Sequence, residues 1–317
     1  MSKIVVILGA TGKQGGSVIN SILSDPTAKP HFSLRAITRD TSKPAAKALA
    51  DRGVEMVAAD LDHKDSLIKA FQGAYAVFAV TDYWNTLSKD VEIQQGKNIA
   101  DAAKTTGVEH FIFSTLINAT KATGGKLSGI EHFDSKATVT DYVISLGLPA
   151  TFWLPGYYMS NLPGQGLRKD ESTGKYVLST PNKPESKFPL IDIVNDTGKF
   201  IKAILLDREG TLGKHILGAS GYYSPQQIID GFAKVFPKDG EGIKFVTVPD
   251  DAYKNALLSN GMPDRVAEEI LQNMHLLNDD YGYYSKEPLE ESIKIVKEPL
   301  VSWEEFLKNT PAFKDLK

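Results

Sequence analysis

The stretch KIVVILGATGKQGGSV, residues 3–18, decides the fold. It begins with an unbroken apolar run, Ile4–Leu8, which is typical of a strand in a parallel sheet covered on both faces. Gly9, Gly12 and Gly15 follow at a G-x-x-G-x-x-G spacing, and the apolar pattern of a helix comes next. Main-chain amides at the start of such a helix suit a pyrophosphate, which side chains at the glycines would keep away. The order of strand, glycine loop and helix therefore predicts a dinucleotide-binding unit rather than a merely tight turn.

The same alternation of apolar runs and helical patterns continues through the first half of the chain. Further runs that indicate strands are Leu34–Thr38, Glu55–Ala58, Ala74–Thr81, Phe111–Ser114 and Thr151–Leu154. Between two of them we expect a helix over residues 86–106. Its predicted buried face consists of Leu87, Val91, Ile99 and Ala103. We therefore predict an α/β fold of Rossmann type, with a doubly wound parallel sheet and a smaller C-terminal α/β substrate region.

The pattern loosens after Pro155, where proline and glycine recur. We predict a cofactor-binding domain over residues 1–155 and a substrate or C-terminal domain over residues 156–317, of which residues 188–220 return to the main sheet. Two later helices have recognisable starts, because Ser224 and Ser302 each precede a Gln or Glu by three residues. The stretch 241–299 carries no functional motif that we recognise.

Composition excludes several classes of function. The 317 residues are 42% apolar and can bury a substantial core, and the lack of cysteine excludes disulfides, thiolate metal sites and a cysteine nucleophile. The net charge of −3 gives no electrostatic footprint for nucleic acid, so direct nucleic-acid binding is not expected. No apolar run approaches the roughly 18 residues of a membrane span, and the N-terminus does not resemble a secretory signal. We expect no membrane association and a cytoplasmic location.

The second strand, SLRAITRD at residues 33–40, indicates which dinucleotide is bound. An acid at the tip of this strand would bind a ribose 2′-hydroxyl, whereas a cation can pair with a 2′-phosphate. Arg39 stands at the tip and Lys43 lies one turn beyond, which favours NADP. The alternative is that both are solvated surface charges, and Asp40 leaves NAD open.

The ends of the third and fourth strands supply further candidates. Asp60 and Leu61 follow the third strand, where such folds cover the adenine, although Asp60 has the alternative role of capping its own turn. Polar and aromatic residues end the fourth strand, at the carboxyl edge where ligands of open α/β sheets bind. They are Thr81, Asp82, Tyr83 and Trp84. The two aromatic residues are predicted to wall the pocket, and ordinary packing is the alternative.

Together these motifs resemble the NmrA-like family, an atypical branch of the short-chain dehydrogenase/reductase superfamily. The resemblance rests on GATGKQGG, TRD, GAYAVFAVTDYW, HFDSK at 132–136 and LPGYYMSN at 154–161, and it extends from residue 3 to about residue 200. The family implies an NADP(H)-binding Rossmann domain and a smaller C-terminal domain. Its members include NADP-sensing regulators without known turnover and reductases of small-molecule pathways.

The resemblance also implies roles for individual residues. It assigns the pyrophosphate to Gly9, Ala10, Thr11, Gly12, Lys13 and Gln14 of the glycine loop, and the last glycine of the spacing, Gly15, is also predicted to be part of the cofactor site. Arg39 and Lys43 would bind the 2′-phosphate, and Asp60 and Leu61 would flank the adenine. At the other end of the cofactor, the nicotinamide would lie beside Thr81, Asp82 and Tyr83, and its ribose would bind Lys136. Residues 157–161 would close over cofactor and substrate, with Tyr157 and Asn161 at the cofactor and Tyr157 and Tyr158 at the substrate. Trp84, predicted above from its place after the fourth strand, is also expected to face the substrate.

One departure from the superfamily concerns the catalytic pair. The usual Tyr-x-x-x-Lys survives as His132-x-x-x-Lys136, one helical turn apart and without the tyrosine. Lys136 is predicted to fix the ribose and to lower the pKa of a nearby acid. His132 is predicted to donate a proton to a developing alkoxide, and Ser114 is predicted to orient the substrate. The alternatives are a surface lysine, a histidine that holds a loop and a serine bonded to main chain.

The missing tyrosine bears on the reaction. A ketone needs a proton as hydride arrives, whereas an iminium ion is already activated by its charge. We therefore predict an NADPH-dependent oxidoreductase that reduces a polarised C=N, C=O or activated C=C bond of a small molecule, with imine reduction as the specific hypothesis. The alternative is a non-catalytic NADP(H) redox sensor that acts through a protein partner. Hydrolases are disfavoured, because the six histidines form no ligand pair at helical spacing, so no metal is expected, and no G-x-S-x-G occurs.

Overall fold

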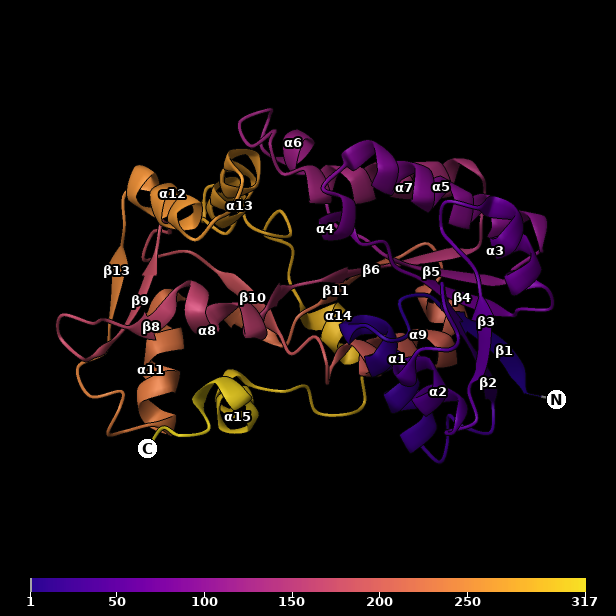
Figure 1. Ribbon diagram of the computed structural model, residues 1–317, viewed down its shortest axis with the longest axis horizontal. Coiled ribbons are helices and arrows are strands. Elements are labelled where there is room, and N and C mark those ends of the chain that lie inside the picture. Colours follow the sequence, from indigo (N-terminus) through magenta and orange to yellow (C-terminus); the bar gives the residue numbers. More distant parts are fainter. Residues whose placement is uncertain (1) are drawn as a thin grey trace.

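The computed structural model describes residues 2–317, apart from the side chain of Gln165. In this part of the chain the central sheet comprises β1 (Lys3–Ile7), β2 (Phe32–Thr38), β3 (Glu55–Ala58), β4 (Ala76–Ala79), β5 (His110–Ser114), β6 (Ala150–Pro155) and β11 (His215–Gly218). All neighbours pair in parallel, in the order β11-β6-β5-β4-β1-β2-β3 (Figure 1). The strands predicted from apolar runs are confirmed, and the order reverses direction between β1 and β4, where open α/β sheets bind ligands.

Helices cover both faces of this sheet, as a doubly wound fold requires (Figure 1). One face carries α1 (Lys13–Ser24), α2 (Pro44–Ala50) and α9 (Thr197–Leu206), and the other carries α3 (Lys64–Phe71), α5 (Lys89–Thr105) and α7 (Glu131–Ser145). Within β1, Val5 and Ile7 pack into the core on the α1 side, while Val6 packs into the core on the α5 side. The continuous apolar run at the start of the chain is thus explained by burial on both faces.

The helix predicted over residues 86–106 is shorter, and half of its predicted face is wrong. A separate short helix, α4 (Tyr83–Thr86), ends at Leu87, whose φ of 51° cannot continue a right-handed helix. Ser88 then caps α5 by accepting a hydrogen bond from the main-chain N of Val91, and Val91 itself is 37% exposed. Ile99 and Ala103 are buried as predicted. The buried stripe of α5 begins at Glu92, one residue after Val91.

The second half of the chain adds two small sheets. One has the order β12-β10-β7 and the other the order β13-β9-β8. Their strands are β7 (Tyr157–Tyr158), β8 (Leu167–Lys169), β9 (Tyr176–Thr180), β10 (Phe188–Ile191), β12 (Gly221–Tyr223) and β13 (Lys244–Thr247). The remaining helices are α6 (Ala119–Ala122), α8 (Leu162–Gln165), α10 (Arg208–Thr211), α11 (Pro225–Val235), α12 (Asp250–Ser259), α13 (Asp264–Leu276), α14 (Glu290–Lys294) and α15 (Trp303–Asn309). Ser224 caps α11 in a full capping box and Ser302 caps α15, as predicted.

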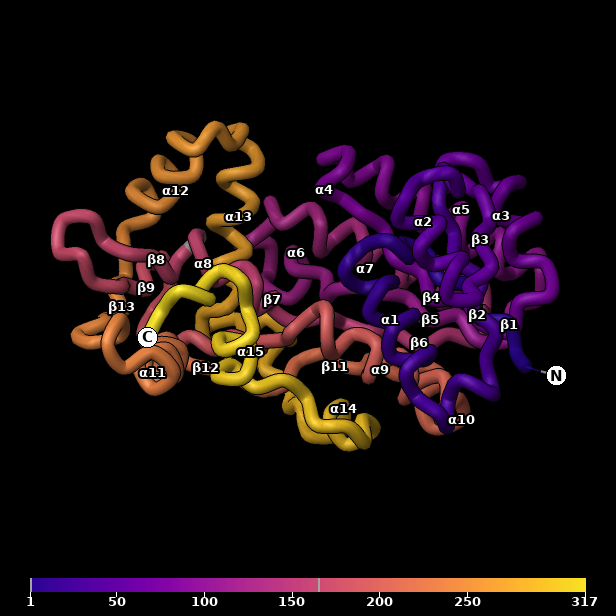
Figure 2. Tube along the Cα trace, turned by 60° about the horizontal axis from the view of Figure 1, so that its bottom comes forward, coloured from indigo at the N-terminus to yellow at the C-terminus, as the bar shows by residue number. Residues whose placement is uncertain are grey.

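Parts of the second half lie against the first (Figure 2). Strand β11 extends the central sheet beside β6, and α9 packs on α1 so closely that a Cβ on Gly198 would lie 2.2 Å from the carbonyl oxygen of Ser17. The main-chain N of Gly198 donates to the Ser17 hydroxyl at 2.9 Å. A division of the chain at residue 155 remains a prediction.

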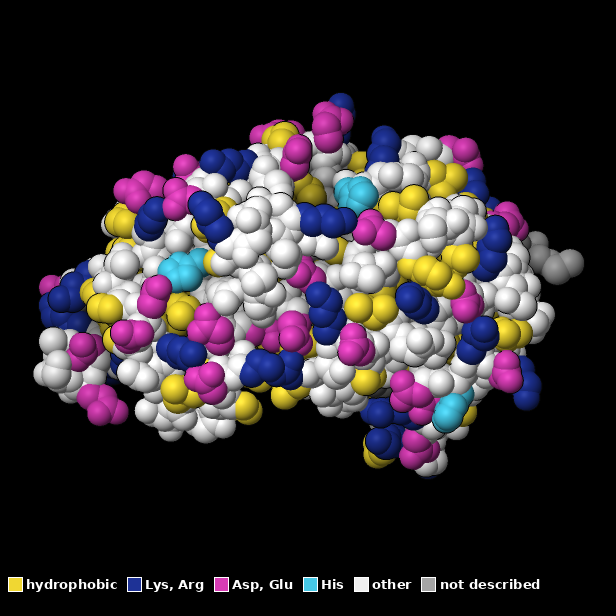
Figure 3. Space-filling view, turned by 90° about the horizontal axis from the view of Figure 1, so that it is seen from above, with side chains coloured by type: hydrophobic (Ala, Val, Ile, Leu, Met, Phe, Trp, Pro, Cys, Tyr) yellow, Lys and Arg dark blue, Asp and Glu magenta, His cyan; other side chains and the backbone are white. Residues whose placement is uncertain are grey.

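The surface carries both charges. Figure 3 shows Lys and Arg side chains interspersed with Asp and Glu over the face seen from above. This face therefore presents no extended field of one sign. Over residues 2–317, every helix is too short or too polar to cross a membrane.

Candidate cofactor and substrate site

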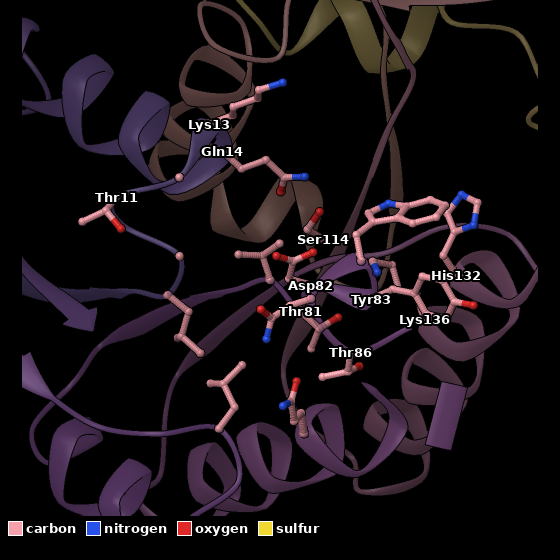
Figure 4. A pocket seen from close by; sticks show the side chains of 18 of the residues that line it. Thr11, Lys13, Gln14, Thr81, Asp82, Tyr83, Thr86, Ser114, His132 and Lys136 are labelled. Atoms are coloured by element: carbon pink, nitrogen blue, oxygen red, sulfur yellow. The ribbon is translucent and has the colours of Figure 1, made fainter. Parts of the chain in front are cut away.

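A cleft of about 820 Å³ opens at the carboxyl edge of the central sheet. It starts at the glycine loop between β1 and α1, passes the ends of β2 and β3, and reaches the ends of β4 and β5 and the start of α7. Figure 4 shows Thr11, Lys13 and Gln14 on one side, His132 and Lys136 on the other, and Thr81 and Ser114 between them. The volume is that of an ordinary site for a cofactor or drug-sized ligand, for which about 300–1,000 Å³ is usual.

The structure brings nearly all of the predicted site residues into this one cleft. Those that line it are Gly9, Thr11, Gly12, Lys13, Gln14, Arg39, Lys43, Asp60, Leu61, Thr81, Asp82, Tyr83, Trp84, Ser114, His132, Lys136, Tyr157, Tyr158 and Asn161. The exceptions are Ala10 and Gly15. Ala10 is buried in the core on the α1 side, and Gly15 faces the main chain of Gly9. The roles assigned to the lining residues remain predictions.

The glycine loop leaves its main chain open to the cleft. Gly9 has a φ of +61°, and a Cβ there would lie 2.8 Å from Val80 Cγ1. A Cβ on Gly15 would lie 2.4 Å from the carbonyl oxygen of Gly9, so α1 can approach the loop only with glycine at this position. Helix α1 begins at Lys13 after Gly12, and no side chain caps it. The free amides of this first turn and the helix dipole behind them fit a pyrophosphate.

Gln14 reaches from the first turn of α1 into the cleft. Its Nε2 donates to the hydroxyl of Tyr158 at 3.0 Å, while its Oε1 is buried and has no hydrogen-bond partner in the described part of the chain. Figure 4 shows Gln14 pointing toward Ser114 and Lys13 pointing away from it. A buried acceptor without a partner is costly, so Gln14 Oε1 is suited to a donor on a bound ligand.

The end of β2 carries two cationic side chains and one carboxylate, Asp40, which is already hydrogen-bonded within its own turn. Arg39 and Lys43 both line the cleft. Asp40 closes its own turn, because its Oδ1 accepts from the main-chain N of Ser42 at 2.8 Å and from the Ser42 hydroxyl at 2.6 Å. The Ser42 hydroxyl holds the pKa of Asp40 below its usual value. With the acid engaged in a turn, the side chains available for a 2′-phosphate are the two cations.

Asp60 lies at the end of β3 and also holds a turn. Its Oδ1 accepts from the main-chain N of Asp62 at 3.1 Å, which is the capping contact given above as the alternative. Asp60 and Leu61 nevertheless both line the cleft, and the carbonyl oxygen of Leu61 accepts from Asn98 Nδ2 at 2.8 Å. Contact of this pair with an adenine remains a prediction.

Lys136 lines the cleft and is held by Glu92 of α5, which is not among the lining residues. Lys136 Nζ and the Ser135 hydroxyl both donate to the Glu92 carboxylate, and the Thr81 hydroxyl donates to Glu92 Oε1 at 2.7 Å. Only 12% of the Lys136 side chain and 1% of the Glu92 side chain are exposed. The lysine is therefore not a surface residue, and its ammonium is fixed at the wall of the cleft by a buried partner.

His132 is held in a similar way by Glu269 of α13. Its Nδ1 lies 2.6 Å from Glu269 Oε1, and its main-chain N donates to the same oxygen at 2.9 Å. Tyr83 donates its hydroxyl proton to Glu269 Oε2 at 2.7 Å. Burial lowers the pKa of His132 more than Glu269 raises it. Burial raises the pKa of Glu269, but the hydrogen bonds from His132 and Tyr83 bring it below its usual value.

Aromatic rings line the same end of the cleft. Trp84 is 47% exposed, and its ring centroid lies 4.9 Å from that of His132 and 5.2 Å from that of Tyr83. Ser114 is 1% exposed, and its hydroxyl has no partner among residues 2–317. The main-chain bond expected as its alternative role is therefore not formed, and the hydroxyl is free for a ligand.

Four residues at this end were missed by sequence reasoning, namely Glu92, Glu269, Asn273 and Tyr283. Asn273 and Tyr283 line the cleft, and Asn273 Oδ1 is a further buried acceptor without a partner in the described chain. The sequence pattern could have indicated that Glu92 is buried, since it lies on the same face of α5 as the buried Gly96, Ile99 and Ala103. No such pattern indicated Glu269, because its partner His132 lies 137 residues earlier.

Comparison with protein families and curated proteins gives consistent matches. The sequence model of the NmrA-like family matches residues 1–307. An NmrA-like family domain-containing oxidoreductase of Malbranchea aurantiaca is 30% identical over 259 residues, which cover 77% of this chain and 75% of that protein. An oxidoreductase of the same description from Cladobotryum sp. is 29% identical over 256 residues and covers 75% of each chain.

Solved structures match over almost the whole length. NmrA, a negative transcriptional regulator solved in complex with NADP, has a TM-score of 0.80 at 20% identity, covering 98% of this chain and 95% of that one. The triphenylmethane reductase of Citrobacter sp., solved with NADP(H), has a TM-score of 0.77 at 22% identity, covering 96% and 99%. At these identities the likeness concerns the fold, which is the Rossmann-type fold predicted from the sequence.

Proposed function

The chain belongs to the NmrA-like family, and from this premise we propose that it reduces a polarised double bond of a small molecule, with an imine as the specific substrate class. It is an NAD(P)-dependent oxidoreductase, like the curated relatives that are named oxidoreductases, and its cofactor is NADP. The observation that carries the proposal is a single cleft that joins the glycine loop and Arg39 to Lys136, His132 and Trp84.

The residues present fit NADP. Gly9 and Gly15 let the loop and α1 pack closely, since a Cβ on Gly9 would meet Val80 and one on Gly15 would meet the Gly9 main chain. Arg39 and Lys43 offer charge to a 2′-phosphate, and Gln14 Oε1 is a buried acceptor that lacks a partner within residues 2–317. NADPH supplies the hydride when bound. Lys136, fixed by Glu92, would hold the ribose at the end where reduction takes place.

The protonation of this end favours C=N over C=O. Where relatives in the superfamily have a tyrosine, this chain has His132, whose Nδ1 lies 2.6 Å from Glu269 Oε1. Burial lowers the pKa of His132, so it is a poor acid at neutral pH. Asp82 lines the cleft, and its charge contributes to the raised pKa of Tyr158, whose main cause is burial. The charge of Lys136 at this end is offset by its buried ion pair with Glu92. The Asp82 carboxylate and a neutral imidazole then suit a substrate that already carries a positive charge, which is the case for an iminium ion and not for a ketone.

NADPH oxidation measured with a panel of imines, ketones and enones tests the proposal. We expect turnover of imines, and turnover of ketones alone would reject the imine hypothesis. Failure of the whole panel, together with a large difference in affinity between NADP⁺ and NADPH, would instead support the redox-sensor alternative.

A further inference from the structure

We propose that Glu269 is a positioning residue that fixes His132 in its Nδ1–H tautomer, so that Nε2 accepts a hydrogen bond from an N–H group of the substrate. The inference rests on the proposed function and narrows the substrate class to protonated imines, which carry an N–H group, as opposed to iminium ions whose nitrogen carries two carbon substituents. It gives a role to α13, which lies in a stretch without a functional motif, and it gives His132 the role of acceptor in place of proton donor.

The position of one carboxylate oxygen decides the tautomer. Glu269 Oε1 lies 2.9 Å from the main-chain N of His132 and 2.6 Å from its Nδ1. The main-chain amide can only donate, so Oε1 is oriented as an acceptor toward His132. If Nδ1 were unprotonated, its lone pair would face a lone pair of Glu269 Oε1 with only 2.6 Å between the two atoms, which is repulsive. Nδ1 therefore carries the proton, and in a neutral imidazole Nε2 is then an acceptor.

Glu269 remains a carboxylate because its other oxygen is also satisfied by a donor. The Tyr83 hydroxyl lies 2.7 Å from Glu269 Oε2 and 2.9 Å from Glu131 Oε2, and Arg265 Nη1 lies 2.6 Å from the same oxygen of Glu131. Burial and these two carboxylates raise the pKa of Tyr83 far above its usual value, so Tyr83 keeps its proton and donates it. Arg265 offsets the charge of Glu131, so the two neighbouring glutamates have separate partners: Glu131 pairs with Arg265, and Glu269 pairs with His132.

The groups that face His132 from other elements leave it neutral. Glu269 of α13 raises its pKa, Lys136 of its own helix lowers it, and Glu92 of α5 raises it, but burial is the largest influence and lowers it. The side chain of His132 is 11% exposed and lines the cleft, and Nε2 has no hydrogen-bond partner among the described residues. The free nitrogen is therefore available to a ligand.

Trp84 points to the same ligand chemistry. Its ring lies beside that of His132, at 4.9 Å between centroids and 47° between planes, and it is half exposed. Indole is the aromatic group that binds cations best. A protonated imine would place its N–H toward His132 Nε2 and its positive charge at the face of Trp84, which a neutral ketone cannot do.

The tautomer is measured by ¹⁵N NMR on protein labelled at histidine nitrogen, without cofactor or substrate. The His132 signals are those lost in His132→Asn. At neutral pH we expect Nδ1 protonated and Nε2 unprotonated in the wild type. Glu269→Gln, whose amide oxygen still accepts, should keep this tautomer, and Glu269→Leu should give a mixture. A wild type with Nε2 protonated, or a Glu269→Leu with the wild-type tautomer, would overturn the inference.

A kinetic comparison tests the consequence for the substrate. A protonated imine with an N–H group should have a kcat/KM about tenfold higher than its N-methylated counterpart in the wild type, the value of one hydrogen bond to a neutral acceptor. Glu269→Leu should lose this preference, whereas Glu268→Leu should keep it, since Glu268 contacts Lys254 and Gln272 outside the cleft. Equal kcat/KM for both imines in the wild type would contradict the acceptor role. If neither imine is reduced, the proposed function fails, and the tautomer measurement still decides the role of Glu269.

Discussion

The two ends of the cleft use different parts of the protein chain. At the glycine loop, the ligand would meet main-chain amides from one short segment, and a single Cβ on Gly9 or Gly15 would clash with Val80 or with the Gly9 main chain. At α7, they are the buried pairs Lys136–Glu92 and His132–Glu269, which join helices far apart in the sequence. The cofactor end thus depends on the shape of a loop, whereas the substrate end depends on the packing of the whole molecule.

Breaking the buried pair at α7 should have the largest effect. In Lys136→Met, Glu92 keeps the Thr81 and Ser135 hydroxyls but loses its cation while it is 1% exposed. Removing one partner of a buried ion pair costs about 3–5 kcal/mol, so we expect the free energy of unfolding in urea to fall by that amount. The double variant Lys136→Met/Glu92→Met should recover most of the loss. A single variant as stable as the wild type would mean that packing alone holds this end.

The matching change at the loop end is Gly15→Ala. The new Cβ would lie 2.4 Å from the Gly9 carbonyl oxygen, and main chain cannot yield as a flexible side chain can. Overpacking of this kind costs about 1–3 kcal/mol. We expect the displaced loop to lose this free energy in cofactor binding, which is a fall in NADPH affinity of about fivefold to about 150-fold in calorimetric titration.

Gly16→Ala is the matched control for this change. Its Cβ would lie at an ordinary 3.5 Å from the Ala10 carbonyl oxygen, and it occupies the same helix. We expect unchanged NADPH affinity and a stability gain of about 0.5–1 kcal/mol, since alanine is the better helix former. Equal losses in the two variants would show that α1, and not the approach of Gly15 to Gly9, sets the affinity.

A smaller and more selective loss is expected at Arg39. In Arg39→Ala the affinity for NADPH should fall by about tenfold, since a charge-assisted hydrogen bond from an exposed side chain contributes about 1.5 kcal/mol, the lower end of its usual range. The affinity for NADH should stay unchanged. Lys47→Ala is the control, because Lys47 lies on α2, close enough for its charge to act on Asp40, but does not line the cleft. Calorimetric titration of both cofactors gives the four affinities. A parallel loss for NADH would remove Arg39 from 2′-phosphate recognition.

The smallest expected effect concerns the pH dependence of stability at the substrate end. Because the pKa of His132 is lowered by burial, the unfolded chain takes up the proton first as the pH falls. Stability from this residue is therefore complete above the ordinary histidine pKa of about 6.5 and is lost as the pH falls from there toward the folded-state value. His132→Asn should flatten the decline in urea-derived stability over this interval. His31→Asn, at an exposed position, should leave it unchanged, and equal flattening in both variants would contradict a buried neutral His132.

The same contrast explains how far the sequence could predict the molecule. The strands, the glycine loop and the capped starts of α11 and α15 follow from patterns within a few neighbouring residues, and the structure has them where they were expected. The error at Leu87 arose because a left-handed residue interrupts an otherwise helical pattern, and leucine gives no warning of a positive φ.

The site was predictable only in part for a related reason. Loop and strand-end residues could be placed in one cleft because parallel strands bring their carboxyl ends to the same edge. Glu92 stood in the buried stripe of α5, and a carboxylate there needs a partner, so it could have been found. Glu269 could not, because only tertiary packing of α13 brings it to His132.

Deuterium transfer from NADPH labelled at C4 to a cyclic imine, followed by mass spectrometry of the amine, tests most directly whether this cleft holds cofactor and substrate together. The expected product carries one deuterium at the former C=N carbon with the wild type and with Gly16→Ala, and little product forms with Gly15→Ala. The contradicting result would be a protein that binds NADPH but leaves every imine unreduced and unlabelled, whether or not it transfers the deuterium to ketones. Such a result would exclude imine reduction at this site.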